Sequence, residues 1–208
     1  MALPRRIRSN VPIPGTQPPP RALFIDRWGT LLEPSEHGFP RFDDVRFVAG
    51  SLEALFRLAG APWRIYLIGN EDEVAQGRVP DREWSEFEAA LLEHLRKQGI
   101  RVARNYACVE DPLNGVAPHN KCSVFRLPDT GIFFHAQQMD GVHLRQSFVI
   151  GDSSLELAAG YRAGCRTIGV ETGAGCRDGK LDIEPELMLP SLTQAVELFL
   201  SSEAYSVR

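Results

Sequence analysis

Positions 24–32 of the chain read FIDRWGTLL. The apolar run Ala22–Ile25 ends here at an acidic residue, and a glycine follows three positions later. Short apolar runs bounded by turn-forming residues are typical of buried strands. In an open parallel sheet, ligands bind just beyond the carboxyl ends of the strands. The stretch therefore predicts a buried strand that presents Asp26 at the functional edge of a sheet.

Short apolar runs alternate with longer amphipathic ones along the rest of the chain, which indicates βα units and a parallel sheet. The clearest helix is expected at 81–98, where large apolar side chains recur at three- and four-residue steps. A long irregular stretch, 110–130, contains three prolines, and loops of this length are usually functional or held in place. We predict a three-layer α/β/α sandwich around a parallel, Rossmann-like sheet with a minimal cap. The other expected strands are 64–68, 105–109, 147–150 and 167–170, and the other expected helices are 51–59, 132–139, 154–163 and 191–200.

Acidic side chains follow two of the predicted strands. Asp26 ends the first, Asp152 follows the strand at 147–150, and Glu156 comes one helical turn later. A single acidic residue in such a place is more often a helix cap. Converging carboxylates, however, are the ligands that Mg²⁺ takes together with water and phosphate. The sequence therefore predicts a Mg²⁺ site formed by Asp26, Asp152 and Glu156.

The ordered set of motifs resembles the haloacid-dehalogenase-like (HAD) hydrolase superfamily, especially the small-capped branch that contains histidinol phosphatase and heptose bisphosphate phosphatase. Positions 26–31, DRWGTL, are similar to the signature D-x-D-G-T-L. GNE at 69–71 stands where that branch has T-N-Q, and RLPDTG at 126–131 stands where it has R-K-P-x-P-G. GD at 151–152 falls at its G-D-x-x-x-D motif. The resemblance covers about 21–175 and implies the HAD-like fold.

In such enzymes the first Asp attacks phosphorus, and the second protonates the leaving oxygen and activates water. A Ser or Thr and a Lys hold the phosphoryl group beside Mg²⁺. The resemblance implies that Asp26 is the nucleophile and a metal ligand, with Asp152 and Glu156 as further ligands. The family also uses the backbone carbonyl two residues after the nucleophile, so Trp28 keeps that ligand.

Three catalytic positions hold other residues. Trp28 replaces the second Asp, Gly69 replaces the Thr, and Leu127 replaces the Lys. Gly69 and Asn70 still occupy the family's substrate-binding positions. We expect Trp28 to point into, or cap, the pocket above Asp26. A missing general acid typically costs ~10²–10⁴ in rate, so the sequence predicts impaired phosphoryl transfer.

Two functions stay open. In the first, the chain is a catalytically impaired HAD-like protein that keeps a metal and anion pocket and binds a phosphorylated small molecule or a protein partner. In the second, it is a Mg²⁺-dependent phosphate-ester hydrolase that uses Asp26 as nucleophile. The residues at 28, 69 and 127 favour the first.

A second metal is also considered. The heptose-phosphatase branch often has a structural zinc in the loop that corresponds to 108–125. The resemblance thus implies a zinc site at Cys108, His119 and Cys122, with Glu110 as a further candidate ligand, although the spacing differs from the family's. The alternative is that these are unliganded residues of a long loop.

Composition limits the remaining function classes. The net charge is −4, which offers no basic surface for nucleic acid, and we expect no membrane association because no apolar run approaches ~20 residues. Four cysteines and the lack of an apolar leader predict a cytoplasmic protein with reduced thiols. Residues 1–20 contain six prolines and are expected to form a disordered arm, followed by one domain at 21–208.

Overall fold

The fold is built on one six-stranded sheet in which all strands are parallel, and the order is β3-β2-β1-β4-β5-β6. The structure, a computed structural model, describes residues 19–35 and 38–206. The central strand β1 is paired with β2 on one edge and β4 on the other, and its apolar side chains are buried on both faces of the sheet. The strands are β1 (Arg21–Asp26), β2 (Trp63–Asn70), β3 (Val102–Cys108), β4 (Phe148–Gly151), β5 (Arg166–Val170) and β6 (Leu187–Leu189).

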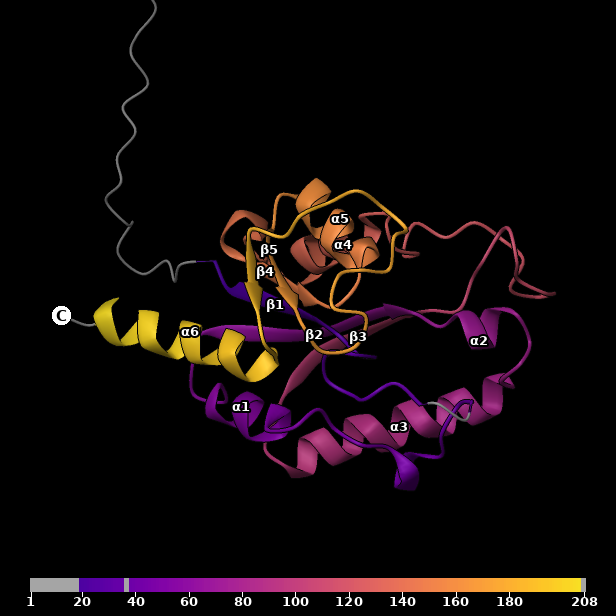
Figure 1. Cartoon of the computed structure of the whole chain (residues 1–208), viewed down its shortest axis with the longest axis horizontal. Coiled ribbons are helices and arrows are strands. Elements are labelled where there is room, and N and C mark those ends of the chain that lie inside the picture. Colours follow the sequence, from indigo (N-terminus) through magenta and orange to yellow (C-terminus); the bar gives the residue numbers. More distant parts are fainter. Residues whose placement is uncertain (1–18, 36–37, 207–208) are drawn as a thin grey trace, which may run out of the picture.

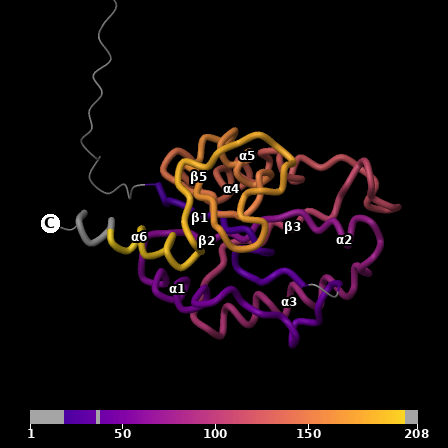
Figure 2. Tube along the Cα trace, viewed as in Figure 1, coloured from indigo at the N-terminus to yellow at the C-terminus, as the bar shows by residue number. Residues whose placement is uncertain are grey.

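Helices cover both faces of the sheet, as Figures 1 and 2 show. One layer contains α1 (Ser51–Arg57), α3 (Asp81–Lys97) and α6 (Leu192–Ser206). The other contains α4 (Gly131–Asp140) and α5 (Ser154–Ala163). The predicted three-layer α/β/α sandwich is therefore confirmed. Three shorter elements complete it: α2 (Asp72–Ala75) and the 3₁₀ helices η1 (Phe42–Asp44) and η2 (Leu144–Gln146).

The two hydrophobic cores follow from the alternation of side chains along β1. Leu23 and Ile25 pack in the core under α1, α3 and α6, whereas Ala22 and Phe24 pack in the core under α4 and α5. Successive side chains of a strand point to opposite faces, so one strand contributes to both cores. Asp26 ends this alternation at the carboxyl edge.

The expected strands and helices are present, with differences at their ends. β3 begins at Val102, three residues earlier than expected, and its pairing with β2 contains an irregularity at Ile65/Tyr66. The edge strand β6 and the four-residue α2 were not predicted, because each is too short to show a periodic pattern. The stretch 110–130 is irregular, as expected.

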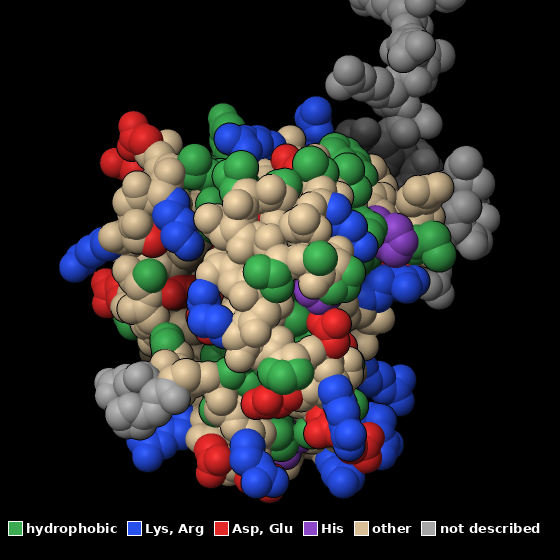
Figure 3. Space-filling model, turned by 90° about the vertical axis from the view of Figure 1, so that its right-hand side faces the viewer, with side chains coloured by type: hydrophobic (Ala, Val, Ile, Leu, Met, Phe, Trp, Pro, Cys, Tyr) green, Lys and Arg blue, Asp and Glu red, His purple; other side chains and the backbone are tan. Residues whose placement is uncertain are grey.

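The predicted arm at 1–20 lies outside the described residues except for its last two. In the described part of the chain, no helix combines the length and apolarity needed to cross a membrane. Figure 3 shows the side of the molecule that carries α2 and the 110–130 loop in Figure 1; Lys and Arg side chains are interspersed there with Asp and Glu.

Candidate metal-binding site

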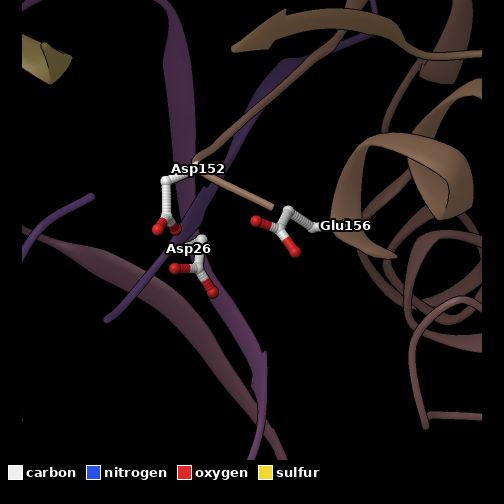
Figure 4. Close-up of side chains that lie close together, drawn as sticks. All are labelled: Asp26, Asp152 and Glu156. Carbon is white, nitrogen blue, oxygen red and sulfur yellow. The ribbon is translucent and has the colours of Figure 1, made fainter. Parts of the chain in front are cut away.

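Three buried carboxylates meet at the carboxyl edge of the sheet. Asp26 comes from the end of β1, Asp152 follows β4, and Glu156 lies in the first turn of α5. Each offers one ligand oxygen, and these oxygens lie within 4.8 Å of one another. Figure 4 shows the three carboxyl groups turned toward a common point. The structure thus brings together the side chains that the sequence singled out as Mg²⁺ ligands.

Local hydrogen bonds hold two of these carboxylates. The Ala174 backbone N–H donates to Asp152 Oδ2 at 2.6 Å. Glu156 accepts the backbone N–H and the hydroxyl of Ser153, both at 2.6 Å, and so completes the capping box of α5. Gly29 has a φ of +89° and passes so close to Asp152 that a side chain there would collide with the carboxylate. The loop after β1 therefore packs directly against the site.

The three buried carboxyl groups are close enough to repel one another when ionised, and a bound cation would offset this repulsion. Burial raises the pKa of Asp26 well above its ordinary value, and the charges of Glu156 and Asp152 raise it further. Burial also raises the pKa of Asp152, and it raises the pKa of Glu156 to about 7. The three ligand oxygens lie within 4.8 Å of one another, and opposite ligands of an octahedral Mg²⁺ lie about 4.2 Å apart. Hard oxygen donors at this spacing fit Mg²⁺, with Asp26, Asp152 and Glu156 as the ligands.

We expect the stability of the metal-free protein to fall as the pH rises from about 4.5 to above 7. In this range folded Glu156 holds a proton that the unfolded chain has released, so the free energy of unfolding decreases with pH. The loss should be on the order of 1–3 kcal/mol. Urea titrations in EDTA at pH 5, 6, 7 and 8 measure it. Glu156→Gln should make the fall shallower without removing it, because Asp26 and Asp152 also have raised pKa values. A parent profile that rises across this range would contradict the prediction.

A buried ion pair lies beside the cluster. Arg27 and Glu71 are 0% and 3% exposed, and Glu71 Oε1 accepts from Arg27 Nε at 2.9 Å and from Nη2 at 2.5 Å. Arg27 Nη1 donates to Asn105 Oδ1 at 2.7 Å and to the Tyr106 carbonyl at 3.3 Å. The guanidinium is therefore fully engaged within the fold. Sequence reasoning missed this pair, because its members are 44 residues apart.

Trp28 occupies the position where the resembled family has its second Asp. Its indole stacks on Phe87 of α3, with ring centroids 5.5 Å apart, and meets Phe39 edge-on. Trp28 Nε1 donates to Glu71 Oε2 at 3.4 Å. The side chain also lines the cavity above Asp26. Trp28 thus borders the cavity as expected, but its ring is anchored in the core under α3.

Gly69 and Leu127, the other two residues that differ from the family pattern, are also closely packed. A Cβ at position 69 would lie 2.9 Å from Arg27 Nη2 and 3.2 Å from Asp26 Oδ1, and its φ of +153° suits glycine. Leu127 is buried among the side chains under α4 and α5. Asn70 donates to the Leu127 carbonyl and accepts from the Leu127 N–H, each at 2.9 Å. Its amide thus fixes residue 127, and a contact with ligand stays a prediction.

The carboxylates open into a cavity of about 180 Å³. Besides the predicted site residues, two charged side chains line it, Asp72 and Lys180. Neither was singled out from the sequence. Asp72 directly follows the GNE motif, which is a signal that could have found it. Lys180 lies in the loop after β5, and no motif marks it.

The candidate zinc ligands are not gathered in this way. His119 Nε2 lies 2.8 Å from Asp81 Oδ1, Cys108 Sγ donates to Glu110 Oε2 at 3.4 Å, and Cys122 is exposed. Among residues 19–35 and 38–206, the group of His, Cys, Asp and Glu side chains with metal-binding spacing is Asp26, Asp152 and Glu156. The zinc site stays a prediction that this arrangement does not support.

Known proteins are similar to this chain in sequence and in fold. A family model described as HAD-hydrolase-like matches residues 124–195. The chain is 27% identical over 179 residues to a D-glycero-beta-D-manno-heptose-1,7-bisphosphate 7-phosphatase from Haemophilus ducreyi, covering 85% of this chain and 96% of that one. A related phosphatase from Thermosynechococcus vestitus is 28% identical over 194 residues, covering 86% and 95%. The chain is thus similar to members of the haloacid-dehalogenase-like superfamily. Within that superfamily it is similar to the heptose-bisphosphate phosphatase branch.

A solved structure supports the same assignment. The D,D-heptose 1,7-bisphosphate phosphatase from B. bronchiseptica, complexed with magnesium and phosphate, superposes with a TM-score of 0.74 and 25% identity. The match covers 88% of this chain and 99% of that one. The HAD-like fold and the branch expected from the motifs are thus confirmed.

Proposed function

We propose that this HAD-like protein binds Mg²⁺ and a phosphorylated small molecule but hydrolyses phosphate esters poorly. The observation that carries the proposal is the packing of Trp28. Its ring is held by Phe87 and its N–H by Glu71, and an indole neither donates the acidic proton nor accepts one as the family's second Asp does. The metal-binding carboxylates beside it are intact.

The cation would be held by Asp26, Asp152 and Glu156, with the Trp28 carbonyl as the family's fourth protein ligand. When bound, Mg²⁺ supplies the positive charge that attracts a phosphoryl oxygen. The chain's own residues shape the space for that group. Gly69, the hydrogen-bonded Asn70 and Leu127, and also Ser153 and Leu155 line the cavity.

A sugar phosphate is the ligand class that we favour over a protein partner. The similar proteins described above are named for a heptose bisphosphate. A cavity of about 180 Å³ is smaller than a typical drug-sized site of ~300–1,000 Å³, so it accommodates a phosphoryl group while the rest of the ligand lies outside. Polar side chains such as Asp72 also line the cavity, and they suit hydroxyl groups.

A second candidate function is slow hydrolysis with Asp26 as the nucleophile. It is favoured by the position of Asp72, which lines the same cavity and could serve as an acid in place of residue 28. Asp72 is paired with Arg126 at 2.9 Å, and Arg126 also contacts Asp111 at 3.0 Å. The ion pair therefore engages Asp72 Oδ1 with Arg126 rather than with the site.

Ligand binding is tested by thermal and chemical unfolding. A ligand that binds only the folded state at one hundred times its Kd adds about 2.7 kcal/mol of stability. We expect Mg²⁺ to raise the melting temperature of the parent. Manno-heptose or hexose phosphates should raise it further, only when Mg²⁺ is present. Asp152→Ala should abolish both increases.

Asp43→Ala is the matched control, because Asp43 is an exposed acidic residue of η1 and does not line the cavity. It should keep the full response to Mg²⁺ and sugar phosphate. A parent protein whose unfolding is indifferent to millimolar Mg²⁺, with or without sugar phosphate, would contradict the proposed function.

A further inference from the structure

A lysine reaches the candidate site from a loop that carries none of the family's motifs. Lys180 lies between β5 and β6 and lines the same cavity as Asp26, Asp152 and Glu156. We propose that the Lys180 ammonium contacts the phosphoryl group of the bound ligand, taking over the role of the missing lysine at position 127. This inference rests on the proposed function and names the residue that recognises the anion.

The fold holds Lys180 at the site from both sides. Asp178 Oδ2 accepts from the Ser154 backbone N–H at 3.2 Å and from the Ser154 hydroxyl at 3.1 Å. The Leu181 N–H donates to Ser154 Oγ at 3.0 Å. Ser154 begins α5 two residues after Asp152. The residues on either side of Gly179–Lys180 are therefore tied to the helix that carries Glu156, which fixes the root of the lysine beside the carboxylates.

The positive charge of Lys180 reduces the net negative charge of the cavity. Among the described residues that line the cavity, four are acidic and Lys180 is the single basic one. With the four carboxylates ionised, Mg²⁺ and Lys180 together leave a net charge of −1, whereas Mg²⁺ alone leaves −2. A phosphate dianion is therefore repelled less when Lys180 is present than when Mg²⁺ acts alone. Arg27 does not substitute, because its guanidinium is fully buried and bonded to Glu71, Asn105 and the Tyr106 carbonyl.

The ammonium is available for a ligand. The structure gives Lys180 no ion pair or hydrogen bond with any residue in the described ranges, and the residue is exposed. The other two lysines are engaged: Lys97 Nζ lies 3.7 Å from Glu93 Oε1, and Lys121 Nζ lies 3.6 Å from Glu110 Oε1. Hydrogen bonds to charged groups are stronger than neutral ones, so an unpaired lysine at a phosphoryl site contributes measurably to affinity.

The chain has only three lysines, and this permits a direct test. Reductive ¹³C-methylation keeps the lysine charge and gives each lysine its own NMR signal. Inorganic phosphate added in the presence of Mg²⁺ should shift the signal assigned to Lys180 and leave those of Lys97 and Lys121 in place. Phosphate without Mg²⁺ should shift none of them.

Calorimetry on unmethylated variants gives the affinity. Lys180→Ala should weaken phosphate binding in Mg²⁺ about ten- to one-hundred-fold, while Mg²⁺ binding alone is no weaker. Lys180→Arg should keep most of the affinity because it keeps the charge. Lys97→Ala is the matched control on α3 and should bind phosphate like the parent.

Two failures are distinguishable. If the parent binds phosphate with Mg²⁺ but Lys180→Ala binds it equally well, the role of Lys180 is wrong and the proposed function stands. If the parent binds no phosphate in Mg²⁺, the proposed function and the role of Lys180 are both overturned. An unshifted Lys180 signal at saturating phosphate would also refute the contact.

Discussion

Hydrolysis of phosphate esters by the parent protein is expected to be no faster than hydrolysis by Asp26→Asn. A missing general acid costs ~10²–10⁴ in rate, and a missing donor to the phosphoryl oxygens costs a further ~10²–10³. These losses need not add. Trp28 is packed against Phe87 and position 69 is closely surrounded, so neither position supplies the missing general acid or hydroxyl group. Phosphate release from p-nitrophenyl phosphate and hexose bisphosphates, with Mg²⁺ at pH 7, measures the rate.

Trp28→Asp is the informative gain-of-function variant. It places a carboxyl group two residues after the nucleophile, and Lys180 already supplies a cation to the cavity. We expect turnover to rise about ten-fold or more over the parent and to vanish again when Asp26→Asn is added. Gly69→Thr is not expected to help, because a Cβ at that position lies 2.9 Å from Arg27 Nη2.

Fast turnover by the parent that is lost in Asp26→Asn would show that the impaired-catalyst proposal is wrong. The structure then ranks the substitute acids. Glu71 is bonded to Arg27 and Trp28, and Glu156 is bonded to Ser153. Asp72 lines the cavity and its ion pair is with Arg126, which does not line the cavity, so Asp72→Asn would be the next variant to measure.

The fold and the carboxylate cluster were predictable because they depend on short-range sequence patterns. The central strand β1 is buried on both faces and therefore reads as a continuous apolar run. Parallel strands bring their carboxyl ends to one edge, so the order of Asp26 and Asp152 along the chain was enough to place them together. Glu156 followed because it lies one helical turn after Asp152 in the sequence, and the structure places it in the first turn of α5.

The surroundings of the site were not predictable, because they depend on contacts between distant segments. Trp28 borders the cavity above Asp26 as expected, but its stacking on Phe87 and its bond to Glu71 join segments far apart in the sequence. Lys180 reaches the site only because Asp178 and Leu181 bond to Ser154, more than twenty residues away. No periodicity or motif in a single sequence records such contacts.

The largest effect on stability is expected from breaking the Arg27–Glu71 pair. Removing one member of a buried ion pair typically costs about 3–5 kcal/mol, since it leaves an uncompensated charge in the interior. Glu71→Ala should reduce the free energy of unfolding by that amount, because Arg27 is 0% exposed and stays protonated. Urea unfolding at pH 7 measures the loss. Glu86→Ala, which breaks the exposed Arg82–Glu86 pair, is the control and should change little.

The stability lost in Glu71→Ala comes more from leaving the Arg27 guanidinium buried without a partner than from the strength of the ion pair. Burial raises the pKa of Glu71 even though the Arg27 charge lowers it, so the ionised carboxylate is itself held at some expense of free energy. Replacing both residues, as Arg27→Met with Glu71→Met, should therefore destabilise the protein less than Glu71→Ala alone. If the double variant is instead the less stable of the two, the pair contributes net stability. In that case, the hydrogen bond that holds Trp28 Nε1 beside the cavity is made to a member of a stabilising ion pair.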